Sequence, residues 1–266
     1  YLPGSSVKGA LRTTLMWGIY TAEKRTPVLS DLGDKRSWAA QPLEHALFAP
    51  AAAGDRRRAP NLDVLRALHV ADSAPTSAEA LHVATVHIFP TARQSQGKGL
   101  DVDVEAIRPG TVFETELAIE EYGFEHGAAL DQLGWDDWRK WLDRLPTLGR
   151  HHANQRLRDE VRFHHDRGGP RPTQLFYNQL ADSWQALAND EWMAQIGWGT
   201  TWNSKTLNNL LREQKAAFDR LVQSYRLQGR GQHRPGDPFP KSRHLALYQG
   251  QPTLPMGWVK CRLEAL

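Results

Sequence analysis

The chain has 266 residues, 40 % of them hydrophobic and 24 % charged, which is the composition of an ordinary globular protein with a substantial core. Its 33 basic residues barely outnumber its 30 acidic residues, so the overall charge alone does not indicate a nucleic-acid partner. The single cysteine, Cys261, excludes an internal disulfide and a multi-cysteine zinc site. Because no apolar run reaches the roughly 18 residues of a membrane helix and no secretory signal is visible, we expect a cytoplasmic protein.

The first segment, YLPGSSVKGALR (1–12), predicts a tight turn that leads directly into an amphipathic helix. Ser5 and Ser6 are both suited to cap the start of this helix. From position 7 onward, apolar residues recur at intervals of three and four, which indicates one buried face. Lys8 and Arg12, four residues apart, are expected on the opposite, solvent-facing side.

This helix start is the first candidate site for a phosphate. A helix N-terminus presents free backbone N–H groups and a partial positive charge, and a lysine one turn inside adds a full charge. The residues expected to form this N-terminal cradle are Gly4, Ser5, Ser6, Lys8 and Arg12. The alternative is an ordinary capped helix with a solvated basic face.

The segment 25–60 is expected to be mainly loop, with a short helix near 42–48 that begins at a proline. Strands are predicted after it, at 68–71, 80–89 and 111–120. The last two alternate between apolar and polar residues, as in an antiparallel sheet covered on one side. Residues 91–99 are expected to form a hairpin tip, and Asp101 and Asp103 fit a strand face better than a metal site.

The segment 131–187 differs because its apolar residues recur at helical spacing and tryptophan is frequent. One predicted apolar stripe comprises Trp138, Trp141, Leu142 and Leu145, and another comprises Leu175, Phe176, Leu180, Trp184 and Leu187. Tryptophan-rich stripes of this kind are more often core than platforms for stacking bases. We therefore expect a helical insertion between two halves of a mixed fold.

The last part of the chain returns to a mixture of strands and helices. The predicted elements are a strand at 192–197, a loop at 197–204, a long helix at 205–227 and strands at 243–248 and 256–263. Together with the earlier strands, they predict an α+β fold of ferredoxin-like (RRM-like) architecture, with an antiparallel sheet and a helical insertion.

The glycine-rich segment IGWGTTWNSKT (196–206) is the second candidate site for a phosphate. Glycine allows a close approach to the backbone, and a lysine at an expected helix start favours an anion. The GxxxxGK[ST] spacing of a P-loop is absent, and a purely structural strand-to-helix turn is the alternative. The residues expected to contact a phosphate here are Gly199, Thr200 and Lys205.

A basic segment near the C-terminus is the third candidate, with only Asp237 opposing its positive charges. Its basic residues are Arg226, Arg230, Arg234, Lys241 and Arg243. A flexible basic loop typically binds a nucleic-acid backbone without reading bases, and Lys241 and Arg243 are the expected contacts. If about six phosphates were bound in all, the affinity for a single strand would fall with salt at a log–log slope near −4.

Eleven histidines raise the question of catalysis. The pairs at 151–152 and 164–165 face different directions at helical pitch, and no HExxH zinc motif is present. A metal-free ribonuclease would need a histidine base beside a cation. His233, His244 and the paired histidines are candidates that their spacing cannot separate. The sequence therefore identifies no catalytic residue, no metal site and no cofactor.

Several of these segments resemble motifs of one protein family. They are PGSSVKGALR (3–12), LHVADS (68–73), IGWGTTWNSKT (196–206), PKSRHL (240–245) and PMGWVK (255–260). In this order they resemble the RAMP superfamily, the RNA-binding subunits of CRISPR effector complexes. Within it they resemble the branch of type III-A (Csm) subunits conventionally numbered five, which lies at the 3′ end of the guide RNA. The chain departs from the branch pattern at Thr201, which stands where the second loop glycine is usual, and at Ser242 and His244.

The resemblance implies a RAMP fold in three parts. Residues 1–125 would form the first part of the RRM-like core, 126–190 the helical insertion, and 191–266 the C-terminal part with the glycine-rich and basic loops. The first strand of the family fold precedes the PGSS motif, so we expect it upstream of Tyr1.

The resemblance also implies a non-catalytic subunit that binds the guide RNA (crRNA) and caps its 3′ end. Such a subunit would support the maturation of the crRNA to its final length and the assembly of the complex in antiviral defence. The expected partners are crRNA and other Csm subunits, chiefly the repeated RAMP backbone subunit, with no membrane and no small-molecule substrate. One alternative is a metal-independent endoribonuclease of the same superfamily that processes precursor crRNA. Another is a mainly protein-binding role, in which the tryptophan-rich insertion docks on a neighbouring subunit.

Overall fold

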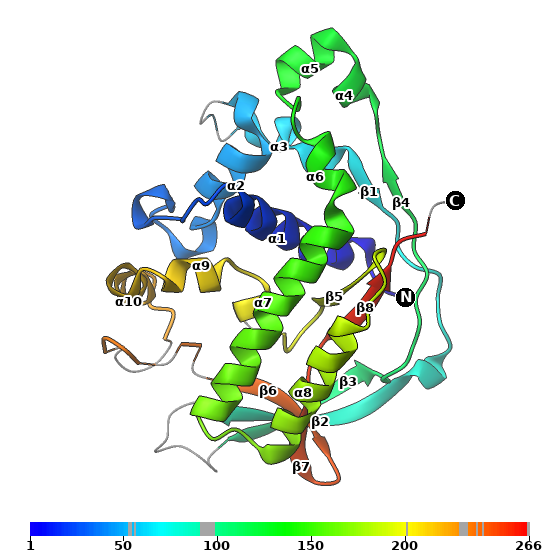
Figure 1. Ribbon diagram of the computed structural model, residues 1–266, viewed down its shortest axis with the longest axis vertical. Helices are drawn as coiled ribbons and strands as arrows, with labels where there is room; N and C mark the ends of the chain where they lie inside the picture. The colour runs from blue at the N-terminus through cyan, green and yellow to red at the C-terminus, as the bar shows by residue number, and fades with distance from the viewer. Residues whose placement is uncertain are drawn as a thin grey trace.

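The computed structural model describes residues 1–52, 55, 57–90, 99–200, 202–228, 234–237, 239–240 and 242–264 (Figure 1). Its α-helices are α1 (Gly4–Ala22), α2 (Gln41–Phe48), α3 (Ala59–Leu62), α4 (Tyr122–Glu125), α5 (Gly127–Leu133), α6 (Arg139–Asp143), α7 (Leu145–Asp166), α8 (Arg171–Gln185), α9 (Asn208–Arg212) and α10 (Lys215–Ser224). Its strands are β1 (Leu68–Val70), β2 (Leu81–Pro90), β3 (Leu100–Ile107), β4 (Leu117–Ile119), β5 (Glu191–Gln195), β6 (Ser242–Tyr248), β7 (Gln251–Pro255) and β8 (Trp258–Arg262). All strand pairs are antiparallel, which confirms the predicted α+β class.

Helix α1 forms the centre of the largest cluster of buried apolar side chains. The predicted buried face is confirmed, since Leu11, Leu15 and Ile19 are almost completely inaccessible. The helix crosses α7 closely: a Cβ at Gly18 would lie 2.8 Å from the Cδ2 atom of Leu148. This contact between two helices far apart in the sequence fixes α1 against the helical insertion.

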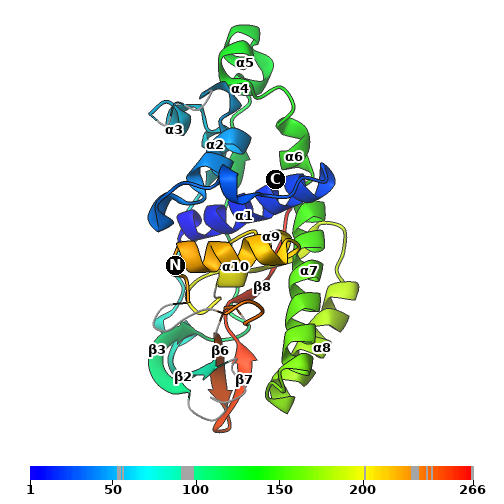
Figure 2. The same ribbon diagram turned by 90° about the vertical axis from the view of Figure 1, so that its left-hand side faces the viewer.

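The largest sheet has the strand order β3-β2-β6-β7 and lies at one end of the molecule, opposite α4 and α5 (Figure 2). The predicted strand at 80–89 is confirmed, and it forms a hairpin with β3. Across this hairpin, His87 Nδ1 lies 2.6 Å from Asp101 Oδ1, and Thr85 donates to Asp103 at 2.7 Å, so the two aspartates lie on a strand face as expected. Of the segment 111–120, only β4 forms a strand, and it pairs with β1.

The helical insertion is confirmed as a run of helices, in which α8 packs along the long helix α7 (Figure 2). Trp138 and Trp141 are buried in the main core, as predicted for the first apolar stripe. The second stripe is partly wrong, because α8 buries Thr173 and Tyr177 and leaves Leu175 exposed.

The predicted long helix at 205–227 is wrong, since the structure divides this segment into α9 and α10. The reason is that its apolar residues serve two separate clusters. Leu210 on α9 belongs to the main core, whereas Phe218 and Val222 on α10 pack around Phe239. A single straight helix could not bury both sets.

Strand β5 is confirmed and pairs with β8, which lies within the predicted strand at 256–263. Strand β7 was not predicted, because Pro252 and Pro255 oppose a strand assignment except at a sheet edge, where β7 lies. The main core draws on residues from all three predicted parts of the chain, and the boundaries of those parts stay a prediction. Among the described residues, no helix is long and apolar enough to cross a membrane.

Candidate nucleic-acid interface

The N-terminus of α1 is capped by the carboxylate of Asp72, which lies two residues after β1, and not by a serine. The backbone N–H of Gly4 donates to Asp72 Oδ1 at 2.7 Å, while Ser5 and Ser6 are exposed and, among the described contacts, neither side chain caps the helix. Glycine is required at this position, because a Cβ would lie 2.6 Å from the carbonyl oxygen of Ala71. The predicted serine cap is therefore wrong. The Asp72 charge now lies where a phosphate would bind, which weakens the case for an anion at the first turn.

This cap gives a first testable prediction. Replacing Asp72 with Ala should lower the free energy of unfolding by about 1 kcal/mol, because the Gly4 N–H loses its acceptor. Ser5→Ala and Ser6→Ala, measured by the same urea titration, should each change it by less than about 0.5 kcal/mol. A larger loss in either serine variant than in the Asp72 variant would restore the serine cap.

The basic face of α1 is partly covered by other elements. The Arg12 guanidinium forms ion pairs with Glu44 Oε2 at 3.0 Å and with Asp63 Oδ2 at 2.8 Å, and it lies 4.1 Å from the centre of the Phe48 ring. Arg12 therefore fastens α2 and the turn before β1 to α1. Burial lowers the pKa of the half-buried Lys8, although the nearby Asp63 opposes this change. Of the two basic residues in the N-terminal cradle, Lys8 is the one with its charge less committed to ion pairs among the described residues.

The glycine-rich segment follows β5 as a tightly folded turn. Gly199 has a φ of 83°, and a Cβ on it would lie 2.9 Å from Met256. Thr200 is buried and donates its hydroxyl to the carbonyl oxygen of Gly197 at 3.0 Å, and its own carbonyl accepts from Ser204 at 2.6 Å. Thr200 therefore acts through the shape of the turn, with its side chain directed into the protein.

Lys205 lies exposed just after this turn, ahead of α9 rather than at the first turn of a helix. A short 3-10 turn, Trp202–Ser204, stands in its place, so the predicted helix start at Lys205 is wrong. The lysine is exposed, as the second candidate site requires, and it directly follows Ser204, whose hydroxyl donates to the Thr200 carbonyl oxygen.

Arg243 is the residue whose environment differs most from the prediction. Only 5 % of it is exposed, its Nε donates to Glu160 Oε2 at 2.7 Å, and its guanidinium lies 3.8 Å from the centre of the Phe163 ring. This side chain joins β6 to α7 and is shielded from a phosphate. Lys241, Thr201, Arg230 and His233 lie outside the described residues.

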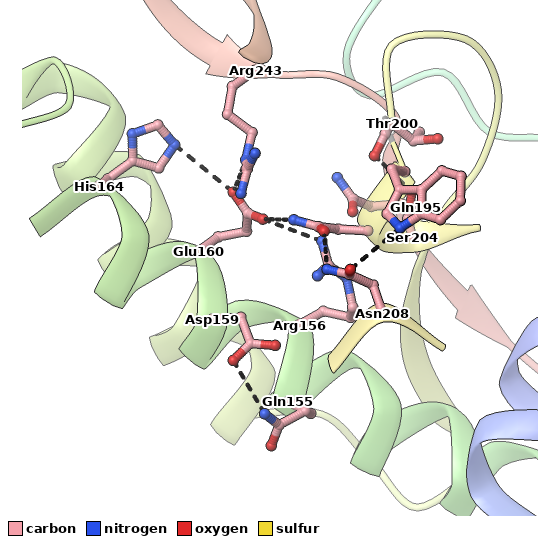
Figure 3. Close-up of polar contacts among 12 residues, drawn as sticks. Gln155, Arg156, Asp159, Glu160, His164, Gln195, Thr200, Ser204, Asn208 and Arg243 are labelled. Carbon is pink, nitrogen blue, oxygen red and sulfur yellow. Dashed lines mark hydrogen bonds and ion pairs between the residues drawn. The ribbon is translucent and has the colours of Figure 1, made fainter. Parts of the chain in front are cut away.

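Figure 3 shows that Glu160 is the centre of a buried polar network. Besides Arg243, its carboxylate accepts from Arg156 at 3.3 Å and from the Asn203 amide at 3.0 Å, and His164 lies 3.9 Å away. Burial alone would raise the pKa of Glu160, but Arg243 and Arg156 lower it to about 2. Since Asn203 belongs to the turn after the glycine-rich loop, this network fixes that turn against α7.

Sequence reasoning missed Glu160, although a signal was present. Arg156, Glu160 and His164 recur at intervals of four, so they lie on one face of α7, and a carboxylate between a cation and a histidine is typical of an ion-pair network. This face of α7 is buried, and the four-residue spacing does not show whether a helix face is buried or exposed.

The second and third candidate sites adjoin one another inside the protein, next to α1. Ala10 of α1 and Ser204 line the same small pocket, which Arg156 and Gln195 also line. Arg156 and Gln195 also line a second small pocket, together with Gly199 and Arg243. The structure thus brings the second and third sites together, while Arg12 and Arg243 serve as internal contacts of the fold.

Two of the four histidines on α7, His152 and His164, are buried and poorly suited to proton transfer at neutral pH. Burial lowers the pKa of His152 to about 3 and that of His164 to about 4. Burial also lowers the pKa of His244. Within the part of the chain that the structure describes, no three histidine, cysteine or acidic side chains gather closely enough to hold a metal ion.

The fold is similar to two solved structures. One is a chain in a cryo-electron-microscopy structure of a Csm–crRNA–target RNA ternary complex from a type III-A CRISPR–Cas system. The TM-score is 0.65 and the identity 22 %, with 99 % of this chain and 72 % of that chain covered. The other is the crystal structure of Csm5 from T. onnurineus, with a TM-score of 0.54, 21 % identity, and 97 % and 70 % of the two chains covered. No protein-family model and no curated protein matches the sequence. At this level of identity the likeness shows the fold, and the predicted fold of type III-A subunits is confirmed.

Proposed function

We propose that this chain is a non-catalytic crRNA-binding subunit of a type III-A (Csm) effector complex. It caps the 3′ end of the guide RNA and thereby supports guide length and complex assembly in the cytoplasm. The observation that carries the proposal is the structural likeness to a chain of a Csm–crRNA–target RNA complex, which covers 99 % of this chain. The sequence motifs resemble the same group of subunits, and they are distributed along the chain from α1 to β8.

In this proposal the guide backbone contacts Lys8 with the exposed Ser5 and Ser6, and Lys205 with the turn at Gly199. Arg12 and Arg243 support these contacts by fixing α1 and β6, and Lys241 stays a predicted contact. Lysine binds a phosphate as a charge and does not read bases, so binding of the backbone should be insensitive to sequence.

The tryptophans of the insertion give little support to the mainly protein-binding alternative. Trp135, Trp138 and Trp141 are buried in the main core, so they present no surface on which a neighbouring subunit could dock. Contacts with other Csm subunits, chiefly the repeated backbone subunit, are instead expected on faces outside this core.

Charge removal tests the proposed contacts. The double variant Lys8→Ala/Lys205→Ala should bind a single-stranded RNA with a log–log salt slope smaller by about 1.4 than wild type, since two phosphate contacts are lost at about 0.7 each. Lys140→Ala is the matched control, because Lys140 pairs with Asp137 on the surface at 2.9 Å, away from the candidate sites. An unchanged slope in the double variant, with a folded protein, would contradict the assignment of these lysines.

A cleavage assay tests the non-catalytic part of the proposal. Purified protein incubated with labelled repeat RNA in EDTA should leave the RNA intact, because the imidazoles of His152 and His164 are buried, where they cannot reach a scissile 2′-OH. A single discrete cut by the purified chain would replace the capping role with the endoribonuclease alternative.

A further inference from the structure

Trp198, in the glycine-rich segment, is an exposed aromatic residue in a protein that buries most of its large side chains. It is 54 % exposed, whereas Trp17, Trp135 and Trp192 are each almost completely buried. The indole stands between two glycines with positive φ, Gly197 at 93° and Gly199 at 83°. The exposed indole leaves an aromatic surface that a partner could contact.

The turn that carries Trp198 is held in shape on its inner side. Thr200 is buried beneath it, and a Cβ at Gly257 would overlap both the Thr200 methyl group and the carbonyl oxygen of Ile196. The N–H of Ile196 donates to the carbonyl oxygen of Gly257 at 2.9 Å, which ties the turn to the loop before β8. The indole is therefore presented from a pre-formed turn, and a partner would meet it with little further ordering.

The surroundings of the indole combine an aromatic ring with a positive charge. The Trp198 ring lies 4.9 Å from the ring of His244, at an interplanar angle of 51°. Lys205 is exposed and directly follows Ser204, whose hydroxyl donates to the carbonyl oxygen of Thr200 at 2.6 Å, so it leaves the same turn that carries Trp198. The indole thus packs at a tilt against His244 and belongs to a turn that also carries an exposed lysine.

We propose that Trp198 stacks on one unpaired base of the guide RNA while Lys205 contacts a neighbouring phosphate. This inference rests on the proposed function and adds a base-stacking position to it. Single-stranded nucleic acids are bound by this combination of an aromatic face and nearby cations, and stacking tolerates any base. A protein partner fits less well, because lysine is depleted at the centre of protein interfaces and the residues flanking this indole are glycines rather than apolar side chains.

The test compares two tryptophans of almost equal exposure. Trp38, 53 % exposed, lies on a surface turn in the segment between α1 and α2 and is the matched control for Trp198. With a short labelled single-stranded RNA, Trp198→Ala should bind about 5- to 150-fold more weakly, the range expected for one lost base stack. Trp198→Phe should retain most of the affinity, and Trp38→Ala should match wild type.

Two further measurements separate stacking from charge and from misfolding. Trp198→Ala should keep the wild-type salt slope, since no phosphate contact is lost, whereas Lys205→Ala should reduce the slope by about 0.7. Trp198→Leu keeps an apolar contact with His244 but offers no aromatic face, so it should bind as weakly as the alanine variant while remaining folded.

The outcomes distinguish this inference from the function on which it rests. Suppose that Trp198→Leu is folded and binds RNA with wild-type affinity, while Lys205→Ala binds more weakly. This result would overturn the stacking role and leave the capping role intact. Failure of the wild-type protein to bind any single-stranded RNA would overturn both. Unchanged RNA affinity with loss of assembly into the effector complex would identify a protein as the partner of Trp198 and overturn the inference.

Discussion

Replacing Glu160 with Gln is expected to destabilise the protein by about 3–5 kcal/mol, the range for removing one partner of a buried ion pair. The carboxylate is 2 % exposed and faces the guanidinium groups of Arg156 and Arg243, at 3.3 Å and 2.7 Å. Glutamine keeps the shape of the side chain but leaves two buried positive charges without a counter-ion. The measurement is the free energy of unfolding in urea at neutral pH.

Asp137→Ala is the control, because Asp137 belongs to an exposed ion pair, with 82 % of its side chain accessible. Its loss should cost less than about 1 kcal/mol. The pH dependence gives a second comparison. Since the pKa of Glu160 is lowered in the fold from 4.5 to about 2, its stabilisation is present above pH 4.5 and is lost as the pH falls toward 2. The difference between wild type and Glu160→Gln should shrink over this interval, and a constant difference would show that the charge is not what Glu160 contributes.

Replacing Gly257 with Ala is the second change with a large expected effect. Its φ of 77° costs a residue with a side chain about 1–3 kcal/mol, and crowding against Thr200 and Ile196 adds about 1–3 kcal/mol. Gly250 is the matched control, because it has a similar φ of 75° but open space around it. Gly250→Ala therefore measures the cost of the conformation alone.

The excess cost of Gly257→Ala over Gly250→Ala, measured by urea unfolding, reports the crowding. The same variant should weaken the binding of single-stranded RNA, because the turn that presents Trp198 and Lys205 must shift to admit the new methyl group. Equal unfolding costs for the two variants would show that the loop before β8 does not constrain the glycine-rich segment.

Much of the fold could be predicted from local patterns. The face of α1 that carries Leu11, Leu15 and Ile19, the alternation in β2 and the helical spacing around Trp138 all report burial directly, and the structure confirms them. The break between α9 and α10 could not be predicted, because it depends on which of two clusters each apolar residue joins, and spacing alone does not carry that information.

The candidate site was less predictable than the fold for a similar reason. Arg12 and Arg243 look like free cations in the sequence, but their partners Asp63 and Glu160 are distant in the chain and meet them only after folding. Lys205 is exposed and Lys8 is partly exposed, which agrees better with what the motifs predict. The exposure of Trp198 could not be predicted, because the sequence of the turn does not show which way the ring points.

The long helix α7 contacts α1 near one end, through Leu148 and Gly18, and the glycine-rich turn near the other, through Glu160 and Asn203. At 1.5 Å per residue, about 18 Å of rigid helix separate these two contacts. The insertion consequently holds α1 and the glycine-rich turn at a constant separation, and it cannot be excised as a detachable module. Shortening α7 by a full turn should displace these two elements relative to each other, whereas deleting the insertion would simply remove the support of both.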